Sequence, residues 1–303
     1  MTITGPQEGD VAFTPYRVVH QTHFAYTAPV SQSWQVAHLT PRGLAWQRVL
    51  SHRIDIAPAP DERHEAFDSF GNSIQHFGLQ KAHRMLQVNM CCEVQVASRA
   101  LLTASGLGWE QVRTPAGPLD LAADLLPARM IEATQLLPLS EPARLYAARS
   151  FSSGRVWLEA VSELMHRIYA DFEFDPEATT VSTKVEEVLE HRRGVCQDFA
   201  HLMLACLRSH GLPARYVSGY LLTDPPPGMP RLLGVDASHA WVAAYAPTHG
   251  WVEFDPTNDQ LADARYITLA WCADFADVVP LRGVILGGGE QEISVKVSVI
   301  PMA

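Results

Sequence analysis

The segment that begins at Cys196 and ends near His210 constrains the fold more than any other part of the chain. It predicts a helix, because apolar residues recur along one stripe that two alanines widen: Phe199, Leu202, Met203, Cys206 and Leu207, with Ala200 and Ala205. Gly211, with Pro213 two residues later, ends this helix. A helix with so much apolar surface is buried, so other elements must pack around it.

Strand-like runs lie on both sides of this helix in the sequence. After it, strands are predicted at 214–222, 239–246, 251–255, 264–271 and 291–300. Before it, the run from Met85 to Ser98 alternates apolar and mostly polar residues, which is typical of a strand with one buried face. Several short strands with turns between them predict a sandwich or a curled sheet in the N-terminal third.

Changes of pattern divide the 303 residues into four segments. These are a loose start at 1–15, an N-terminal β-domain at 16–98, a proline-punctuated connecting segment at 99–153 and a domain of helices and strands at 154–303. The last domain opens with a predicted helix at 154–171. Further on, Thr183-Lys184-Val185-Glu186 predicts a capping box that opens a short helix ending at Gly194. The predicted fold class is therefore α+β.

Charge and cysteine content disfavour several classes of function. The formal charge is 23 − 33 = −10, which argues against nucleic acid or an anionic membrane surface as the main partner. No apolar run approaches the roughly 20 residues that span a bilayer, and the N-terminus lacks the pattern of a signal peptide. Five cysteines without a Cys-x-x-Cys pair indicate neither a disulfide framework nor a zinc site. We therefore expect a cytoplasmic protein with free thiols, no metal and no cofactor; the oligomeric state stays open.

Three residues of complementary chemistry follow one another along the chain. Cys196 starts the buried helix, His239 starts a predicted strand, and Asp255 ends the next strand. A thiol, an imidazole and a carboxylate can act as a nucleophile, a base and a group that orients the base. The unpaired amides at the helix start favour a negative sulfur and are available for an oxyanion hole. These residues are the candidate catalytic triad.

The pairing of the two strands decides whether His239 and Asp255 meet. A turn near 247–250 brings the second strand back along the first, and a slip of one residue moves a side chain to the other face. We predict a five-residue connection, 245–249, that places the two residues opposite each other, or a bulge that restores this pairing.

Each candidate also has an ordinary structural explanation. Cys196 alone fits a small buried hydrophobe, His239 a core histidine, and Asp255 a residue that caps its own turn before Pro256. The enzyme hypothesis is favoured because all three explanations would have to hold at once.

The remaining cysteines and one nearby histidine are expected to be structural. Cys91 and Cys92 are consecutive on a strand, so they point to opposite faces and cannot chelate together. Cys206 lies on the apolar stripe of the helix. His201 is five residues after Cys196 and points away from the nucleophile's side of the helix start.

The chain resembles the bacterial branch of the transglutaminase-like superfamily, which shares its catalytic core with papain-type cysteine peptidases. The resemblance rests on Cys-Gln-Asp-Phe-Ala-His at 196–201, Ala-Trp after His239, Asp-Pro-Thr at 255–257 and, earlier, Leu-Thr-Pro-Arg at 39–42 and Phe-Gly-Asn at 70–72. It implies a papain/transglutaminase-like core with the cysteine on a central helix against an antiparallel sheet, preceded by a small β-sandwich-like domain. One departure is Cys-Ala-Asp-Phe at 272–275, where the family suggests Gly-Arg-Asp-Tyr.

The resemblance also implies acyl transfer through a thioester without a metal. Cys196 is then the nucleophile, His239 the general base and acid, and Asp255 the orienter. We expect a peptide or protein amide as substrate, and hydrolysis rather than cross-linking, because nothing in the sequence indicates an acceptor site for a protein lysine. One alternative is a catalytically silent binding or assembly module on the same scaffold. A thiol redox sensor is disfavoured because Cys206 is about 15 Å along the helix from Cys196.

Overall fold

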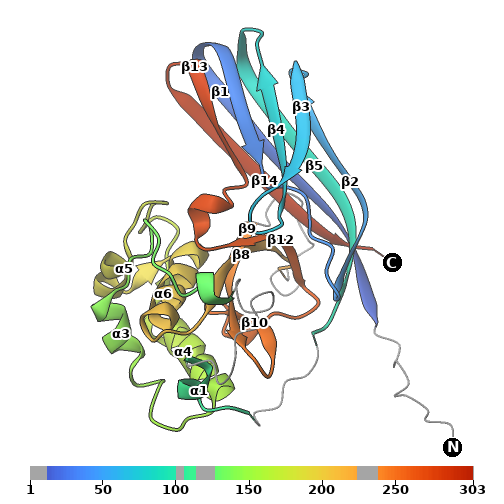
Figure 1. Ribbon diagram of the computed structural model, residues 1–303. Coiled ribbons are helices and arrows are strands. Elements are labelled where there is room, and N and C mark those ends of the chain that lie inside the picture. The colour runs from blue at the N-terminus through green and yellow to red at the C-terminus, as the bar shows by residue number, and fades with distance from the viewer. Residues whose placement is uncertain (1–11, 100–105, 114–126, 224–237, 303) are drawn as a thin grey trace, which may run out of the picture.

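The computed structural model describes residues 12–99, 106–113, 127–223 and 238–302, and it has two parts. A strand-rich part, the N-terminal sheet, lies beside a part in which helices pack on a second sheet, the core sheet (Figure 1). The mixed α+β class predicted from the sequence is confirmed.

The N-terminal sheet has seven strands arranged around the long first strand. They are β1 (Phe13–Ala37), β2 (Gln47–Ala57), β3 (Glu62–Phe67), β4 (Ser73–Leu79), β5 (His83–Ala97), β13 (Leu281–Gly287) and β14 (Gln291–Pro301). Along one edge of β1 lie β5 and then β4, and along its other edge lie β14 and then β13. Strand β2 continues the sheet beyond β5, and β3 beyond β4. All pairings in this N-terminal β-domain are antiparallel, as expected for its β-rich sequence.

This sheet is built from both ends of the described chain. Tyr16 pairs with Pro301 and Tyr26 with Gln291, so the core is inserted between β5 and β13. Strand β1 starts at Phe13, inside the segment expected to be loose, and residues 1–11 of that segment lie outside the described residues. Two stretches of the predicted connecting segment, 100–105 and 114–126, also lie outside them.

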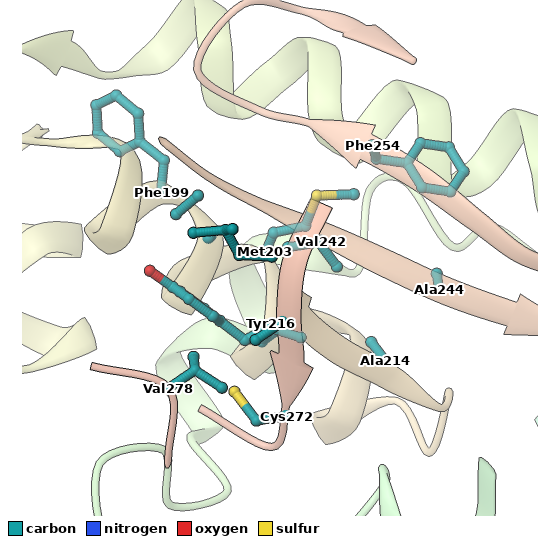
Figure 2. Close-up of a cluster of buried hydrophobic side chains, with 14 of the residues drawn as sticks. Phe199, Met203, Ala214, Tyr216, Val242, Ala244, Phe254, Cys272 and Val278 are labelled. Atoms are coloured by element: carbon teal, nitrogen blue, oxygen red, sulfur yellow. The ribbon is translucent and has the colours of Figure 1, made fainter. Parts of the chain in front are cut away.

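The core sheet carries the predicted helix on one face. Its strand order is β11 (Gln260–Leu261), β10 (Gly250–Asp255), β9 (Ser238–Ala246), β8 (Ala214–Leu221) and β12 (Tyr266–Cys272). The helices are α1 (Trp109–Arg113), α3 (Glu141–Ala147), α4 (Trp157–Asp171), α5 (Val185–His191) and α6 (Cys196–Ser209). In α6 every residue from Asp198 to Arg208 is buried, as the apolar stripe predicted. Figure 2 shows Met203 of this helix beside Tyr216 and Val242 of the sheet.

The predicted capping box before α5 is wrong. The N-cap residue is Lys184, not Thr183, and its side chain makes no capping bond. The Thr183 hydroxyl, which the capping box required at the helix start, accepts from the amide of Thr180 at 2.9 Å instead. The helix ends with Arg192 in the left-handed region, φ 57°, two residues before the predicted Gly194. Residues Arg193–Gly194 form the short strand β7, which pairs in parallel with β6 (Glu173–Phe174).

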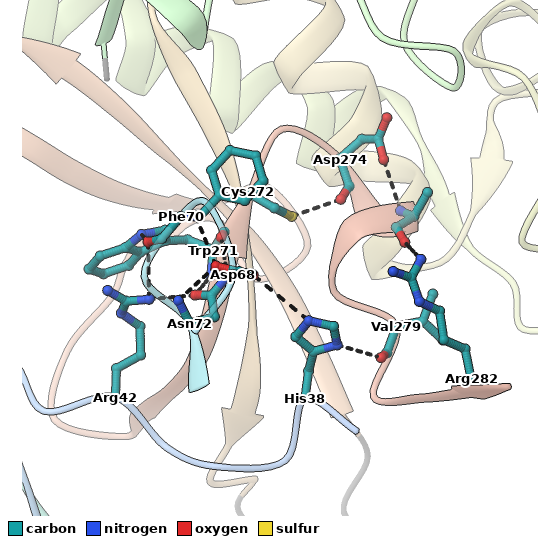
Figure 3. A network of polar contacts seen from close by, with 11 residues as sticks. His38, Arg42, Asp68, Phe70, Asn72, Trp271, Cys272, Asp274, Val279 and Arg282 are labelled. Carbon is teal, nitrogen blue, oxygen red and sulfur yellow. Dashed lines mark hydrogen bonds and ion pairs between the residues drawn. The ribbon is translucent and has the colours of Figure 1, made fainter. Parts of the chain in front are cut away.

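Two side-chain amides of the N-terminal sheet cover the free edge of β12. Gln47 accepts from the amide of Thr268 and donates to its carbonyl, each at 2.8 Å. Asn72 does the same at Trp271, at 2.8 and 3.0 Å (Figure 3). Trp271 is also stacked between two guanidinium groups, those of Arg42 and Arg215, at 3.7 and 3.6 Å from its ring centre. An edge strand with unpaired backbone groups can pair with other chains. At this seam, where Gln47 and Asn72 meet β12, the amides and carbonyls of Thr268 and Trp271 find their partners within the molecule.

Replacing Asn72 with alanine is expected to lower the free energy of unfolding by about 2–4 kcal/mol. Asn72 is fully buried, and its loss leaves the amide and carbonyl of Trp271 without partners. Urea denaturation measures the change. The matched control is Gln80→Ala, which removes an exposed amide that bonds to Glu62 at 3.3 Å and is expected to have little effect. Equal losses for the two variants would contradict a structural role for the seam.

Candidate active site

Cys196 is the first residue of α6, and a buried carboxylate organises the turn before it. Asp198 accepts from the amide of Val195 at 2.8 Å and from the hydroxyl of Thr179 at 2.6 Å. Gly194 is needed there, because a Cβ on this residue would lie 2.9 Å from the Asp198 side chain. The helix start is thus held by side-chain contacts, and Cys196 stays partly exposed at its tip.

His239 and Asp255 meet, but in a register that differs from the predicted one. The connection between β9 and β10 has three residues, 247–249, and Ala246 pairs with Gly250, whose φ of 68° suits the turn. Phe254 pairs with Val242, so Asp255 lies level with Trp241 and two residues along from His239. The predicted directly opposite pairing is therefore wrong. Because the offset is two, both side chains still share one face, and the ring Nε2 lies 2.7 Å from Asp255 Oδ2.

The two oxygens of Asp255 have separate tasks. Oδ1 accepts from the amide of Thr257 at 2.9 Å, which is the turn-capping bond expected from an ordinary strand-end aspartate. Oδ2 faces three groups: His239 Nε2 at 2.7 Å, Asn258 Nδ2 at 2.7 Å and the Tyr266 hydroxyl at 2.6 Å. The carboxylate is fully buried and its possible rotation is restricted by these four bonds.

The charges at the site favour a protonated ring beside an ionised carboxylate. Burial lowers the pKa of His239, but hydrogen bonds and charges from Asp255 and Cys196 outweigh burial and raise the pKa to about 10. Burial likewise raises the pKa of Asp255, while His239, Asn258 and Tyr266 together bring that pKa below its ordinary value of 3.8. Because the hydrogen bonding and charge of Cys196 contribute to the raised pKa of His239, the thiol lies near the ring. The structure therefore joins His239 and Asp255 by a direct contact, with Cys196 near the imidazole.

Two residues of this arrangement, Asn258 and Tyr266, were missed from the sequence. Asn258 lies three residues after Asp255 in the turn, a position from which a side chain can reach back, so this spacing was a usable signal. Tyr266 opens β12, beyond the short strand β11, and nothing in the local sequence connects it with Asp255.

Trp241 packs beneath the imidazole rather than lining an opening. The two rings are stacked with centroids 6.0 Å apart, and Trp241 is fully buried. Gly219 makes room for the indole, since a Cβ there would lie 2.6 Å from it and 2.1 Å from the carbonyl of Ile267.

Cys91, Cys92, Cys206 and His201 occupy structural positions in the fold. Cys92 is fully buried and Cys91 half-buried, on opposite faces of β5. Burial raises the pKa of Cys92 and of Cys206 to about 12. His201 accepts from the amide of Phe275 at 3.3 Å, and burial lowers its pKa to about 4, so it is a neutral structural residue.

The segment 272–275 that departs from the family pattern is anchored to α6. Arg208 donates to the carbonyl of Ala273 at 2.6 Å, and the ring of Phe275 lies 6.1 Å from that of Tyr216. Asp274 is buried and caps the short 3₁₀ turn Phe275–Asp277 through the amide of Ala276.

No three side chains of His, Cys, Asp or Glu within 12–99, 106–113, 127–223 and 238–302 gather closely enough to hold a metal ion. None of the helices in the same ranges is both long and apolar enough to cross a membrane.

Comparison with protein families gives two matches, and the second of them includes Cys196, His239 and Asp255. Residues 16–95 match the bacterial transglutaminase-like N-terminal region, and residues 146–256 match the transglutaminase-like superfamily.

Some individual relatives extend over nearly the whole chain, and another matches only part of it. The protein Rv2569c of Mycobacterium tuberculosis is 43% identical over 299 residues, 94% of this chain and 92% of that protein. The protein ML0607 of Mycobacterium leprae is 32% identical over 290 residues, 95% of this chain and 99% of that protein. A protein-glutamine gamma-glutamyltransferase of Pseudomonas aeruginosa is 36% identical over 91 residues, only 30% of this chain and 14% of that enzyme.

One solved structure has the same architecture. It is named a "Putative Cysteine Protease" from Cytophaga hutchinsonii and superposes with a TM-score of 0.76 and 18% identity. The superposition covers 96% of this chain and 92% of that one, so the similarity extends to both parts of the fold.

Proposed function

Because the chain belongs to the transglutaminase-like superfamily, we propose that it is an enzyme that transfers acyl groups from amides through the thiol of Cys196. The observation that carries the proposal is the contact of His239 with the buried carboxylate of Asp255, together with the influence of the nearby Cys196 on the pKa of the ring. An imidazole that holds its proton to about pH 10 beside a thiol is what a thiolate–imidazolium pair requires.

The chemistry begins with attack of the sulfur on the carbonyl carbon of the amide. The new C–S bond forms as an electron pair moves to the carbonyl oxygen, and the free amides at the start of α6 are suited to stabilise that charge. When the tetrahedral intermediate collapses, the C–N bond breaks and His239 gives its proton to the leaving nitrogen. A thioester on Cys196 and a neutral imidazole remain.

The neutral ring then acts as a base in the second half of the reaction. It takes a proton from water, whose oxygen attacks the thioester, and the collapse releases a carboxylic acid and restores the thiolate–imidazolium pair. A primary amine in place of water would give a new amide. We propose water as the acceptor and a peptide or protein amide as the donor, since nothing in the sequence indicates an acceptor site for a protein lysine.

A panel of fluorogenic peptide amides, assayed with and without a primary alkylamine, tests this proposal. We expect release of the fluorophore with the free acid as the main product by mass spectrometry. Millimolar amine is expected to leave the rate unchanged. Cys91→Ser is the matched control, because this half-buried thiol has no partner in the triad and the variant should retain full activity.

Other products would replace parts of the proposal. An acyl-amine as the main product would overturn hydrolysis and leave thiol-dependent transfer in place. No turnover on any amide, together with a Cys196 that iodoacetamide alkylates no faster than a free thiol, would replace the enzyme with a binding module.

A further inference from the structure

Tyr266 makes the shortest of the three contacts to Asp255 Oδ2, and it lies outside the three residues proposed to do the chemistry. We propose that Tyr266 is a positioning residue that holds the carboxylate of Asp255 in the rotation that aims Oδ2 at His239. This inference rests on the proposed function, because it assigns Tyr266 a task in the same reaction.

The direction of the hydrogen bond from Tyr266 is fixed by its neighbours. Gln260 Nε2 has only hydrogens to offer and lies 2.5 Å from the phenol oxygen, so Tyr266 accepts there. The ionised carboxylate of Asp255 can only accept, so the hydroxyl donates to Oδ2. Burial, and next the charge of Asp255, raise the pKa of Tyr266, so the hydroxyl keeps its proton. The Tyr266 hydroxyl therefore donates to Asp255 wherever Asp255 is ionised and Tyr266 keeps its proton.

Gln260, which donates to the Tyr266 hydroxyl, is itself held in place by further contacts. Gln260 accepts from Arg265 Nη2 at 2.7 Å, and it pairs with Asp255 across the hairpin of β10 and β11. The ring of Tyr266 packs edge-on against Trp241 with centroids 5.3 Å apart. Its hydroxyl is thus fixed from one side by packing and from the other by an amide.

An arginine from the N-terminal part holds the strand that carries Tyr266. Arg99 follows β5 and donates to the carbonyls of Asp263 and Tyr266, the latter at 3.5 Å. Its guanidinium also pairs with the buried carboxylate of Glu253 at 2.8 Å, two residues before Asp255 on β10. The spacing between β10 and the start of β12, across which Tyr266 reaches Asp255, is therefore set by a residue outside the core.

The consequence for catalysis concerns orientation. Without the Tyr266 hydroxyl, the carboxylate of Asp255 can rotate about its Cβ–Cγ bond. Each rotation that moves Oδ2 away from His239 Nε2 leaves the imidazole less well oriented to deliver its proton to the substrate. This affects the bond-breaking step and not substrate binding. It also removes a donor that lowers the pKa of Asp255, so the carboxylate should take up a proton at a higher pH.

The test compares Tyr266→Phe with Tyr220→Phe in the full chain. Tyr220 is an equally buried tyrosine whose hydroxyl bonds to His20 at 2.8 Å, on the side of the N-terminal sheet and away from Asp255. We expect Tyr266→Phe to lower kcat about tenfold with KM unchanged, and Tyr220→Phe to leave both as in the wild type.

A spectroscopic measurement separates positioning from simple stabilisation. The Nε2–H proton of His239 should give a downfield NMR signal that is lost on acidification, when Asp255 becomes protonated. In Tyr266→Phe this loss is expected at a higher pH than in the wild type, and in Tyr220→Phe at the same pH. If the two variants behave alike in kcat and in this titration, and differ from the wild type only in thermal stability, Tyr266 is merely structural.

Two further measurements test the role of Tyr266 separately from the proposed function. Gln260→Leu keeps the phenol but frees its hydroxyl, and we expect about a threefold loss of kcat with the same direction of the NMR shift, even where Tyr266→Phe fails to fold. Alkylation of Cys196 by iodoacetamide in the wild type, relative to Cys91, tests the underlying function. A rapid wild-type reaction with unchanged kcat in both variants overturns this inference alone, whereas an unactivated Cys196 overturns the proposed function and the inference with it.

Discussion

Replacement of Cys196 by alanine is expected to abolish amide hydrolysis, with a loss in kcat of at least about 10⁴-fold, because no other group can form the thioester. Folding should be little affected, since the residue is partly exposed at the tip of α6 and the turn before it is held by Asp198, Thr179 and Gly194. Initial rates on the best amide of the panel measure the loss, and thermal unfolding checks the fold.

Covalent trapping gives the same prediction an independent measurement. Mass spectrometry of the wild type quenched in acid during turnover should show the acyl group on the peptide that contains Cys196. The Cys196→Ala protein should carry none, and the Cys91→Ser control should be labelled like the wild type. An acyl group on another residue, or substantial activity in Cys196→Ala, would rule out the proposed nucleophile.

Replacement of Asp255 by asparagine is expected to lower kcat by about 10³- to 10⁴-fold with little change in KM. The asparagine has nearly the same shape but no charge. Burial then lowers the pKa of the His239 ring with only Cys196 to oppose it, so the ring loses its proton at a pH well below 10. Steady-state kinetics gives kcat and KM, and the NMR titration of the ring gives the pH at which the proton is lost.

The same substitution should also change how stability depends on pH. In the wild type the folded ring binds its proton up to about pH 10, against an ordinary value of 6.5, so its contribution is full below pH 6.5 and is lost as the pH rises towards 10. The carboxylate, whose pKa is lowered from 3.8, contributes above that value and loses its contribution as the pH falls through the lowered pKa. The pair therefore stabilises the fold most between about pH 4 and 6.5. Asp255→Asn is expected to cost about 3–5 kcal/mol there and to flatten the decline between pH 6.5 and 10.

The chain offers a matched control for this buried pair. His166 and Asp259 form a second histidine–aspartate contact at 2.7 Å in the same turn region, with the imidazole largely exposed to solvent. Because solvent screens this pair, Asp259→Asn should change neither kcat nor the shape of the pH–stability curve. A loss of activity equal to that of Asp255→Asn would show that the turn as a whole, and not the charge at 255, supports catalysis.

Much of the core was predictable because its signals are local. The stripe from Phe199 to Leu207 predicted a buried helix, and α6 begins at the predicted residue and ends within one residue of the predicted end. The five strands predicted after it lie within two residues of their observed bounds, since alternation and turn residues mark both ends, whereas β11 and β13 were not predicted. Local patterns thus placed the cysteine and the histidine on the correct elements.

The pairing between distant elements could not be predicted from the sequence. The hairpin connection was predicted two residues too long, because several turn lengths are compatible with Pro247-Thr248-His249-Gly250. The contact survived because an even offset keeps both side chains on one face. Tyr266 was missed for a related reason: its hydroxyl reaches Asp255 only after β11 and β12 have packed, and no local period reports such a contact.

The way β1 is completed has a consequence for synthesis on the ribosome. One edge of β1 can pair with β5 as soon as residue 97 has emerged, but its other edge has to wait for β13 and β14, which are translated after the whole core. During that interval a long strand presents unpaired amides and carbonyls to every neighbouring nascent chain. A nascent chain stopped before residue 281 would therefore hold an N-terminal sheet in which this edge of β1 has neither of the strands that cover it in the finished fold.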